Sequence, residues 1–541
     1  MTKQKQSLSS PSGLIGTVVA AILASQPLIA APVLLESGDG VISIDGELVS
    51  FEDGFYSVNT SLGNLRVSAD LVTCSGEGCP TEVASADARP ERRPAPRRDD
   101  LVNISGSDAI GSTLMPLLVE GYADSFDGAV QVERNNDVEK ILLAIEDGGF
   151  GEERTGFRIM SSLSSDAFAN LIGRSTEIGM SSERIPQASA DILARNGAGD
   201  MRSAANEHLL ALDNIVVIAH PDNPLDTVSM TQLGDIYAGR ISNWSEIGGP
   251  NAPIRVVNRM ANTSTRTVFE DRVFRDVAPG LPVNQVGAGD FEDVADEVFA
   301  DETSIAYVPL PFIRGTKPMN IINECGIVMT PDAFSARTEE YNLGRFLYLY
   351  TRGDILSPEA ADFLDFAKSN DADSVILKAG YIDLGVARQA QDMTGFRATQ
   401  LRNNSATGLE AQVTGDMLSA MRRHDRLSAT FRFQTGSAQL TDRGELNLDR
   451  LADYAEDLPA GSRLVFVGFA DSVGPFANNL PLSEARAAQV LRAFRDRAGA
   501  SLDGIQTTSL GFSELAPASC NTTEEGRAIN RRVEVWIANE S

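Results

Sequence analysis

The sequence predicts a multidomain α/β protein. It has 541 residues, too many for one hydrophobic core when a domain usually holds about 150. The central part, 101–386, alternates continuous apolar runs such as 215–219 with amphipathic stretches such as 230–237. Buried strands covered by helices give this alternation. A shorter region, 32–80, has alternating apolar and polar residues separated by Asp-Gly steps, typical of antiparallel strands joined by tight turns.

Composition and charge limit the possible partners. Hydrophobic residues make up 42% of the sequence and charged residues 22%, the balance of an ordinary globular protein. The formal net charge of −29 at pH 7 would repel nucleic acids and anionic membrane surfaces. We therefore expect neither of these as a partner.

The first 31 residues are expected to be an export signal. Lys3 and Lys5 precede an apolar run at 14–23, and small residues follow a polar break. This order is typical of a secretory signal peptide, with cleavage expected between Ala24 and Ala31. An uncleaved signal anchor is the alternative. Either arrangement places the rest of the chain outside the cytoplasm.

The region 32–80 is predicted to be a small β-module with a disulfide loop. Cys74 and Cys79 enclose two glycines, which let the chain turn back until the two sulfur atoms meet. The alternative, half of a metal site, lacks a second Cys or His pair nearby. Cys325 and Cys520 lie alone in different segments, so the sequence does not establish their state.

Two connectors are expected between the folded parts. Residues 81–100 are rich in Pro and Arg and have no apolar periodicity, which predicts an extended linker. Residues 387–427 are polar, with one possible helix, and lead into a last domain at 428–541. That last domain has the pattern of strand, helix, strand, helix and strand.

The C-terminal region resembles the OmpA-like peptidoglycan-binding family. The blocks that carry the resemblance lie at 433–438, 468–471, 479–487 and 526–534. The resemblance implies a small α/β sandwich that binds the peptidoglycan of the cell wall. This domain would anchor the protein without a covalent bond.

The same resemblance implies which residues hold the ligand. In that family an Asp closing the second block and an Arg in the third hold the diaminopimelate residue of the stem peptide, and the matching residues are Asp471 and Arg486. A fixed carboxylate suits an ammonium group, and a planar guanidinium suits a carboxylate. Asn479 is expected to shape the same loop. Of Arg531 and Arg532, one is expected to support the site through an internal pair, and Arg532 is included among the site residues.

The central region resembles the PstS-type phosphate-binding proteins, which have the periplasmic substrate-binding fold. The segments that carry this resemblance are 106–112, 178–182, 233–244, 259–270 and 304–308. The resemblance implies two α/β lobes that close on a ligand around crossing segments. The crossings are expected near Ile215 and Ile305, with a second lobe at 220–303 and a first lobe made of 101–214 and 310–385.

An anion site is expected between these lobes. Two stretches rich in Ser and Thr, 107–112 and 263–265, are expected to begin helices, whose free N–H groups favour anions. Arg259 would supply positive charge. Simple helix capping is the alternative role for the serines and threonines. The expected ligand-binding residues are Ser107, Asp108, Ala109, Ser181, Ser182, Arg259, Thr263, Ser264 and Thr265.

The anion motif departs from the family pattern at several positions. The family has Ser-Gly-Thr where this sequence has Thr-Ser-Thr at 263–265, and it has Asp at the positions of Ser182 and Ala261. Asp108 is then the nearby carboxylate that could accept the proton of hydrogen phosphate, a contact that unprotonated sulfate cannot make. Phosphate is the expected ligand, and another small anion is the alternative.

The sequence shows no catalytic constellation. His208, His220 and His424 lie far apart, and neither a nucleotide-binding loop nor a metal-ligand cluster occurs. We therefore expect a binding protein without a cofactor or a metal, rather than an enzyme such as a phosphatase. The predicted function is to anchor to peptidoglycan near the outer membrane and to present a phosphate-binding domain in the periplasm. The alternative is a structural protein of the envelope whose clamp domain binds a protein or a polymer.

Overall fold

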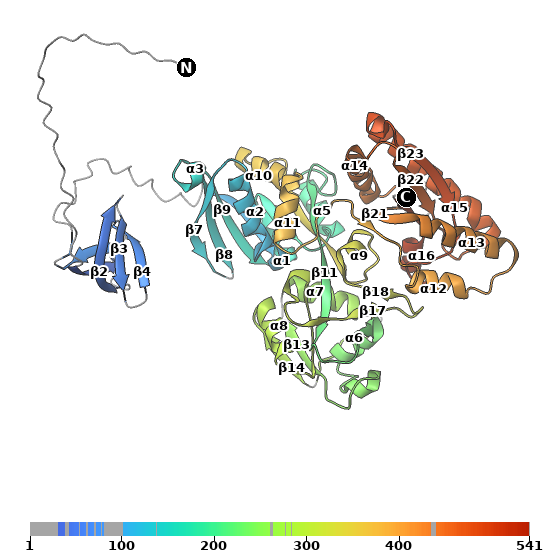
Figure 1. Cartoon of the computed structure of the whole chain (residues 1–541), viewed down its shortest axis with the longest axis horizontal. Coiled ribbons are helices and arrows are strands. Elements are labelled where there is room, and N and C mark those ends of the chain that lie inside the picture. The colour runs from blue at the N-terminus through green and yellow to red at the C-terminus, as the bar shows by residue number, and fades with distance from the viewer. Residues whose placement is uncertain are drawn as a thin grey trace, which may run out of the picture. The chain divides into compact units, whose positions relative to one another are not determined.

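The computed structural model divides the chain into two compact units, 1–95 and 96–541 (Figure 1). The expected signal peptide, up to residue 30, and the expected linker, 81–100, lie outside the described residues. No helix within the described residues is long and apolar enough to cross a membrane. The structure describes residues 31–37, 43–52, 55–60, 63–69, 72–76, 78–79, 101–136, 138–259, 263–275, 277–282, 284–433 and 440–539.

The first unit is a β-module. Its strands form an antiparallel sheet in the order β4-β3-β2-β1-β5. Leu35, Leu48 and Val58 lie in its small core, and Cys74 is bonded to Cys79, as their spacing predicted. The strands are β1 (Ala31–Ser37), β2 (Ser43–Glu52), β3 (Phe55–Thr60), β4 (Gly63–Ser68) and β5 (Val72–Ser75).

The second unit contains a large mixed sheet in the order β14-β13-β15-β11-β19-β10-β6-β9-β8-β7, with β16 paired to β11. Strand β11 belongs to both lobes, because its first half pairs with β19 and its second half with β15. The strands are β6 (Val102–Ser107), β7 (Ala129–Asn135), β8 (Glu139–Ile145), β9 (Glu153–Ser162), β10 (Ile178–Ser181), β11 (Glu207–Ala219), β13 (Arg255–Arg259), β14 (Gln285–Ala288), β15 (Ser304–Pro309), β16 (Lys317–Pro318) and β19 (Gly344–Thr351).

Each half of this sheet has its own core. Phe157 and Phe363 lie in the core of the first lobe, and Trp244 and Phe269 lie in the core of the second. The first lobe contains α1 (Asp108–Gly111), α2 (Leu114–Asp124), α3 (Glu146–Gly149), α4 (Ser164–Ile172), α5 (Gln187–Arg195), α10 (Pro358–Lys368) and α11 (Asp371–Lys378). The second contains α6 (Met230–Tyr237), α7 (Ser264–Val273), α8 (Phe291–Phe299) and the sheet of β12 (Thr227–Ser229), β17 (Asn320–Ile322) and β18 (Val328–Met329).

The second lobe is larger than the sequence predicted. Of the segment 310–385, expected in the first lobe, the part up to 343 was assigned wrongly, because Ile321, Met329, Tyr341 and Leu343 pack in the core of the second lobe. The chain returns to the first lobe only as β19 begins. The sequence did not reveal this because short strands and turns fill the segment between β15 and β19.

The last part of the second unit is a sandwich around a sheet of order β20-β21-β24-β22-β23. Phe466 and Val535 face a core with α14 and α15, whereas Val465 and Trp536 face a core with α12 and α13. Alternate side chains of one strand point to opposite faces, so helices cover both. The elements are α12 (Phe396–Asn403), α13 (Gly408–Arg423), α14 (Asp442–Glu456), α15 (Phe476–Ala498), α16 (Glu524–Asn530), β20 (Arg388–Gln389), β21 (His424–Arg432), β22 (Arg463–Gly468), β23 (Gln506–Gly511) and β24 (Arg532–Ala538).

The segment 387–427 differs from the connector that its polarity suggested. It holds β20, α12, α13 and the start of β21. Leu401, Val413 and Met417 of its helices are buried against the sheet. Spaced apolar residues within a polar stretch are the pattern of an amphipathic helix, so this segment is part of the C-terminal fold.

Ion pairs join the C-terminal sandwich to the segment that follows α9 (Ala333–Arg337). Glu339 lies 2.9 Å from Arg432 and 3.0 Å from Arg443, and Arg426 donates a hydrogen bond of 3.0 Å to Glu340. Burial alone would raise the pKa of both carboxyls, but these arginines outweigh it and hold each pKa below its ordinary value. Both carboxylates therefore stay charged at the interface.

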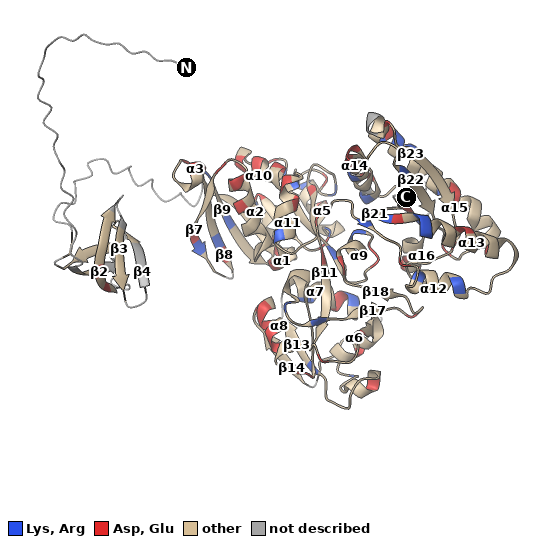
Figure 2. Cartoon of the chain, viewed as in Figure 1, with Lys and Arg blue, Asp and Glu red and all other residues tan. Residues whose placement is uncertain are grey.

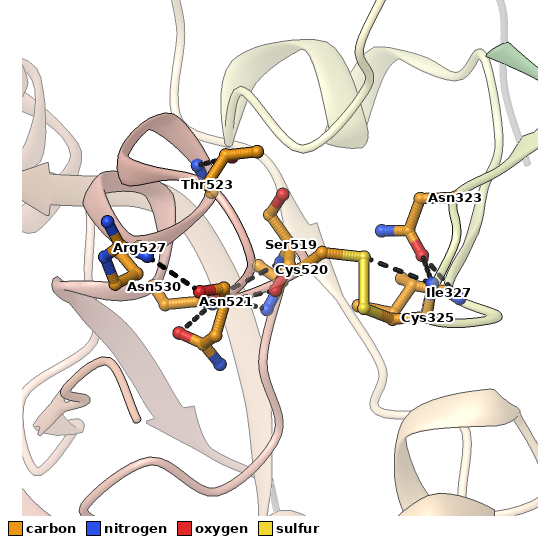
Figure 3. Close-up of a disulfide and its surroundings, with 11 residues drawn as sticks. Asn323, Cys325, Ile327, Ser519, Cys520, Asn521, Thr523, Arg527 and Asn530 are labelled. Atoms are coloured by element: carbon orange, nitrogen blue, oxygen red, sulfur yellow. Dashed lines mark hydrogen bonds between the residues drawn. A yellow bond between two sulfur atoms is a disulfide. The ribbon is translucent and has the colours of Figure 1, made fainter. Parts of the chain in front are cut away.

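A disulfide also joins these two parts. Cys325, in the turn between β17 and β18 of the second lobe, is bonded to Cys520, in the loop before α16 (Figure 3). The sequence left the state of both cysteines open. Their pairing ties the second lobe covalently to the C-terminal sandwich.

Candidate functional site

Serines from both lobes meet at the edge of the large sheet. Strands β6 and β10 are parallel neighbours, so their carboxyl ends lie at the same edge, where ligands of open α/β sheets usually bind. The hydroxyls of Ser107 and Ser182 are 2.5 Å apart. Ser182 donates its backbone N–H to Ser164 Oγ at 3.1 Å, and Ser164 donates its own N–H to Ser264 Oγ at 3.1 Å. The N-terminal ends of α4 and α7 therefore face each other across the lobes.

A glycine permits this close approach. Gly106 has a φ of +130°, and a Cβ atom there would lie 2.1 Å from the carbonyl oxygen of Met180. Only glycine avoids both the backbone strain and the clash. Ser107 is thereby held beside the end of β10.

Arg259 brings positive charge to the same place. It is the last residue of β13 and is 7% exposed. Its Nη2 donates a hydrogen bond of 3.3 Å to Asp108 Oδ2 in the other lobe, and its Nη1 donates to the carbonyl oxygen of Gly289. The guanidinium also lies 4.3 Å from the ring centre of Phe291. These contacts fix the guanidinium between the lobes.

Buried polar atoms near this pair lack a hydrogen-bond partner among the described residues. They are Asp108 Oδ1, Arg259 Nε and the hydroxyl oxygens of Ser112 and Ser161. A buried polar group without a partner is unfavourable, so these atoms could be satisfied by a small ligand that both accepts and donates hydrogen bonds. A protonated oxyanion has that combination.

The surface charge of the protein does not decide the electrostatic field at this cluster. The ribbon of α8 and α10 carries several acidic residues, coloured red in Figure 2, in keeping with the net charge of −29. Ionic screening limits the reach of exposed charges to about 8–10 Å. Arg259 and Asp108 therefore dominate the local field.

The expected anion residues do not all face this cluster. Thr265 Oγ1 accepts a hydrogen bond of 3.0 Å from Arg345, which is paired with buried Asp213 where β11 crosses between the lobes. The carbonyl oxygen of Ala109 accepts from Tyr381 at 2.5 Å, and Ser181 Oγ donates to the carbonyl oxygen of Glu183. Thr263 is the residue before α7, at its N-cap. Ser107, Asp108, Ser182, Arg259 and Ser264 are the expected residues that come together.

Sequence reasoning missed Ser161 and Ser164. Strand β9 ends at Ser162, and α4 begins at Ser164. Serines thus lie between the end of a strand and the start of a helix, and Ser107 and residues 263–265 likewise lie at helix starts. The same pattern in the sequence could have identified this third segment.

Asp471 lies in a tightly held loop at the other candidate site. Its Oδ2 accepts a hydrogen bond of 2.8 Å from Arg531 Nη1, and its Oδ1 accepts one of 3.0 Å from the N–H of Val473. Asn479 Nδ2 donates to the carbonyl oxygen of Asp471 and to Glu514 Oε2, both at 3.1 Å. Asn479 therefore holds the backbone of the loop rather than its carboxylate.

Arg486, on α15, is available for a ligand. Its Nη1 has no hydrogen-bond partner among the described residues, and its guanidinium lies 5.7 Å from the ring centre of Phe433. Burial and the nearby Arg531 lower the pKa of Arg486, and Asp471 opposes this shift. A half-buried guanidinium in this setting would gain from an added carboxylate.

Arg532 is buried and makes an internal ion pair. It is 1% exposed, donates to Glu534 Oε1 at 2.7 Å and donates to the carbonyl oxygen of Ala516 at 3.0 Å. Burial lowers the pKa of Arg532 to about 10. Arg532 pairs with Glu534, whereas Arg531, one residue earlier, is the arginine that meets Asp471. A shift of one residue at the start of β24 turns the side chain to the opposite face.

A cavity of about 1220 Å³ lies between the first lobe and the C-terminal sandwich. His208, Lys368, Asp373, Arg443 and Arg450 are among the residues that line it. Basic and acidic side chains both line this cavity. Such a lining favours neither an anionic nor a cationic ligand. Because of this mixed lining, we do not regard the cavity as a candidate site, and the candidates are the serine cluster and the loop of Asp471.

Family comparisons match both main parts of the chain. Residues 127–371 match a PBP superfamily domain, and residues 432–531 match the OmpA family. The phosphate-binding protein PstS of Bacillus subtilis (strain 168) is 27% identical over 294 residues, which cover 54% of this chain and 85% of PstS. The peptidoglycan-binding protein ArfA of Mycobacterium tuberculosis is 38% identical over 90 residues, which cover 17% of this chain but only 26% of ArfA.

A solved structure is similar to the central part as well. An ABC-type phosphate transport receptor from Vibrio cholerae is 20% identical, with a TM-score of 0.40, covering 52% of this chain and 99% of the receptor. The two resemblances drawn from the sequence blocks are confirmed by the family matches. The chain therefore joins a PstS-like domain of the PBP superfamily to a C-terminal domain of the OmpA family.

Proposed function

We propose that this protein is a binding protein of the cell envelope, not an enzyme, and that it anchors to peptidoglycan through its OmpA domain. The observation that carries the proposal is the position of Arg486 beside the ion pair of Asp471 and Arg531, with its Nη1 lacking a partner in the described part of the chain. In this proposal the PstS-like domain is presented in the periplasm. The expected signal peptide supports this location.

The ligand proposed for the OmpA domain is the diaminopimelate residue of a stem peptide. The far end of that residue carries one ammonium and one carboxylate. The carboxylate of Asp471 suits the ammonium, and the guanidinium of Arg486 can donate paired hydrogen bonds to the ligand carboxylate. The name of the mycobacterial relative, a peptidoglycan-binding protein, supports this assignment.

Co-sedimentation of the full chain with two kinds of wall tests the proposal. The protein should sediment with diaminopimelate-type peptidoglycan and much less with lysine-type peptidoglycan, which lacks the second carboxylate. Free meso-diaminopimelate should compete for binding. Equal sedimentation with both walls would contradict the proposed ligand, and no sedimentation with either would contradict the anchoring function.

For the PstS-like domain we propose hydrogen phosphate or a similar small oxyanion as ligand. Arg259, the hydroxyls of Ser107 and Ser264 and the N-terminal ends of α4 and α7 are donors suited to anionic oxygens. Asp108 Oδ1 is buried, has no hydrogen-bond partner among the residues that the structure describes, and suits the proton of hydrogen phosphate as an acceptor. The likeness to PstS of Bacillus subtilis supports phosphate.

Calorimetric titration with phosphate, using sulfate as the comparison, tests this second part. Phosphate should bind at micromolar concentration, and sulfate should bind far more weakly because it has no proton to donate to Asp108 at neutral pH. Equal affinity for both anions would contradict the role of Asp108.

One observation favours the alternative function, a clamp that holds a protein or polymer. Asp108 bonds directly to Arg259, and Ser164 bonds directly to Ser264, so the lobes already satisfy part of each other's polar groups. A structural clamp would need no small ligand. Absence of both phosphate and sulfate binding, with wall binding intact, would favour this alternative.

A further inference from the structure

The disulfide partner in the second lobe is held by a rigid turn. The side-chain oxygen of Asn323 accepts hydrogen bonds of 3.0 Å from the N–H groups of both Cys325 and Ile327. Gly326 between them has a φ of +77°, which glycine adopts readily. Ile327 is buried in the core of the second lobe. Figure 3 shows Asn323 and Ile327 grouped around Cys325, so this cysteine has a fixed position on the lobe.

The partner cysteine lies in an equally constrained loop of the OmpA domain. Cys520 is 6% exposed, and a Cβ atom on Gly526 would lie 1.8 Å from its carbonyl oxygen. Asn530, at the end of α16, accepts from the N–H groups of Ala518 and Ser519 and donates to the carbonyl oxygen of Ser519. The loop is thus packed directly on α16.

The next residue, Asn521, connects the disulfide to the wall site. Its side-chain oxygen accepts a hydrogen bond of 3.2 Å from the N–H of Ser472, the neighbour of Asp471, and another of 3.0 Å from Asn530. Its carbonyl oxygen accepts from Arg527 at 3.0 Å. One residue beyond the disulfide, the loop therefore touches the backbone that presents Asp471.

Helix α16 gives a second connection between the same parts. Its Glu525 pairs with Arg275 beyond the end of α7, and its Glu524 lies 2.7 Å from Arg531, the arginine bonded to Asp471. The Arg275 pair is largely exposed, and exposed pairs stabilise little. The disulfide is therefore the principal restraint that the second lobe places on this region.

We propose that the second lobe of the clamp is a positioning element of the wall site, acting through the Cys325–Cys520 disulfide and Asn521 on the loop of Asp471. The inference rests on the proposed binding of diaminopimelate. Asn521 and the two cysteines touch no ligand in this account. They hold Ser472 and Asp471 in place before the stem peptide binds. The loop therefore loses less conformational entropy on binding, which favours affinity.

The test uses the full chain and a soluble muropeptide that contains meso-diaminopimelate, with affinity measured by calorimetry. The double variant C325S/C520S should bind about tenfold more weakly, the size expected when one or two groups must be ordered on binding. The matched control is C74S/C79S, which removes the disulfide of the β-module and should leave affinity unchanged. Hydrogen exchange should speed up at 471–474 and 516–523 while the amides of β22 and β24 stay protected.

A second variant separates positioning from general stability. Asn521→Ala should weaken binding by a similar factor with the disulfide intact. Because the disulfide is proposed to act through Asn521, adding C325S/C520S to that variant should give little further loss. Rescue is expected with Asn521→Asp, whose carboxylate can still accept the N–H of Ser472.

The outcomes distinguish this inference from the proposed function. If the unaltered chain fails to bind the muropeptide, the wall assignment itself is contradicted. If it binds and both Asn521→Ala and C325S/C520S bind equally well, the positioning role is overturned while the wall assignment stands. Independent, multiplicative losses in the combined variant would overturn the route through Asn521. If C325S/C520S loses hydrogen-exchange protection in β22 and β24, the sheet itself is destabilised. The affinity of Asn521→Ala alone then supports or overturns the positioning role.

Discussion

Arg531 donates a hydrogen bond of 2.8 Å to the carboxylate of Asp471, whereas Nη1 of the neighbouring Arg486 has no hydrogen-bond partner among the described residues. Both side chains of the pair are 13% exposed. The internal pair fixes the carboxylate, and the half-buried guanidinium of Arg486 remains to be satisfied. A ligand with one ammonium and one carboxylate would complete the cluster.

Removing either group of the proposed wall pair should abolish measurable binding. Asp471→Ala removes the proposed partner of the ligand ammonium and leaves Arg531 paired with Glu524 alone, and Arg486→Ala removes the donor to the ligand carboxylate. Loss of one partner of a buried charge pair typically weakens binding by about 2–5 kcal/mol, some thirtyfold or more. Co-sedimentation with diaminopimelate-type peptidoglycan measures the effect. Arg492→Ala, an exposed arginine of the same helix, is the control, and a comparable loss there would argue against a specific site.

Arg259→Ala should remove phosphate binding by the PstS-like domain. The guanidinium is buried, and its truncation also leaves Asp108 without its cross-lobe partner, so we expect a loss of about a hundredfold or more. Calorimetry with phosphate measures it. Arg240→Ala is a matched control, because Arg240 lies in the same lobe and pairs with Asp235 at the surface. Unchanged phosphate affinity in Arg259→Ala would move the anion site elsewhere.

His208 should make the folded protein sensitive to mild acid. Burial, with a smaller effect of Lys368, lowers the pKa of His208 to about 4. The unfolded chain binds a proton below its ordinary pKa of 6.5 while the folded chain does not, so stability falls as the pH drops from 6.5 towards 4. Between pH 7 and pH 4.5 the contribution is about 2–3 kcal/mol.

The comparison of His208→Gln with the unaltered chain isolates that contribution. Urea unfolding at both pH values should show that the variant loses less stability on acidification. Thr351, which lies 3.0 Å from the imidazole, can bond to the new amide. Equal loss in both proteins would mean that carboxylates alone account for the acid sensitivity.

The two disulfides should stabilise the protein to different extents. Cys325 and Cys520 are 195 residues apart, whereas Cys74 and Cys79 are 5 apart. In the chain-entropy model, closing the long loop contributes about 5 kcal/mol and the short one about 2 kcal/mol. Chemical unfolding of C325S/C520S and C74S/C79S without reductant measures both. An equal, small effect of the two pairs would show that the loop length does not set the stabilisation.

The local sequence was sufficient to predict the position of those candidate residues that lie within one motif. Asp471 and Asn479 fall in contiguous blocks, and the serines at 107–112 and 263–265 do begin helices. The sequence did not distinguish the roles of Arg531 and Arg532. Strand β24 begins at Arg532, and a start one residue earlier or later would change which of the two side chains is buried.

Relations between distant segments could not be predicted in the same way. Cys325 meets Cys520 only because the OmpA domain docks on the second lobe, and no local pattern encodes that docking. The segment from β16 to the start of β19 was assigned to the wrong lobe for a related reason. The apolar residues of this segment would suit the core of either lobe by composition. Which core they join depends on where the chain returns from the second lobe to the first, which is at β19.

The disulfide between the lobe and the OmpA domain also sets a mechanical limit. A pull transmitted from the wall enters the chain at Asp471, inside the loop that the bond between Cys325 and Cys520 closes. With the bond intact, the shorter way from Asp471 to Cys325 runs over the 49 residues from 471 to 520 rather than over the 146 residues from 325 to 471, so the chain that could be drawn out falls from roughly 480–530 Å to roughly 160–180 Å. The tether therefore stays shorter under tension, and β19, which lies on the longer way, carries no load while the bond holds.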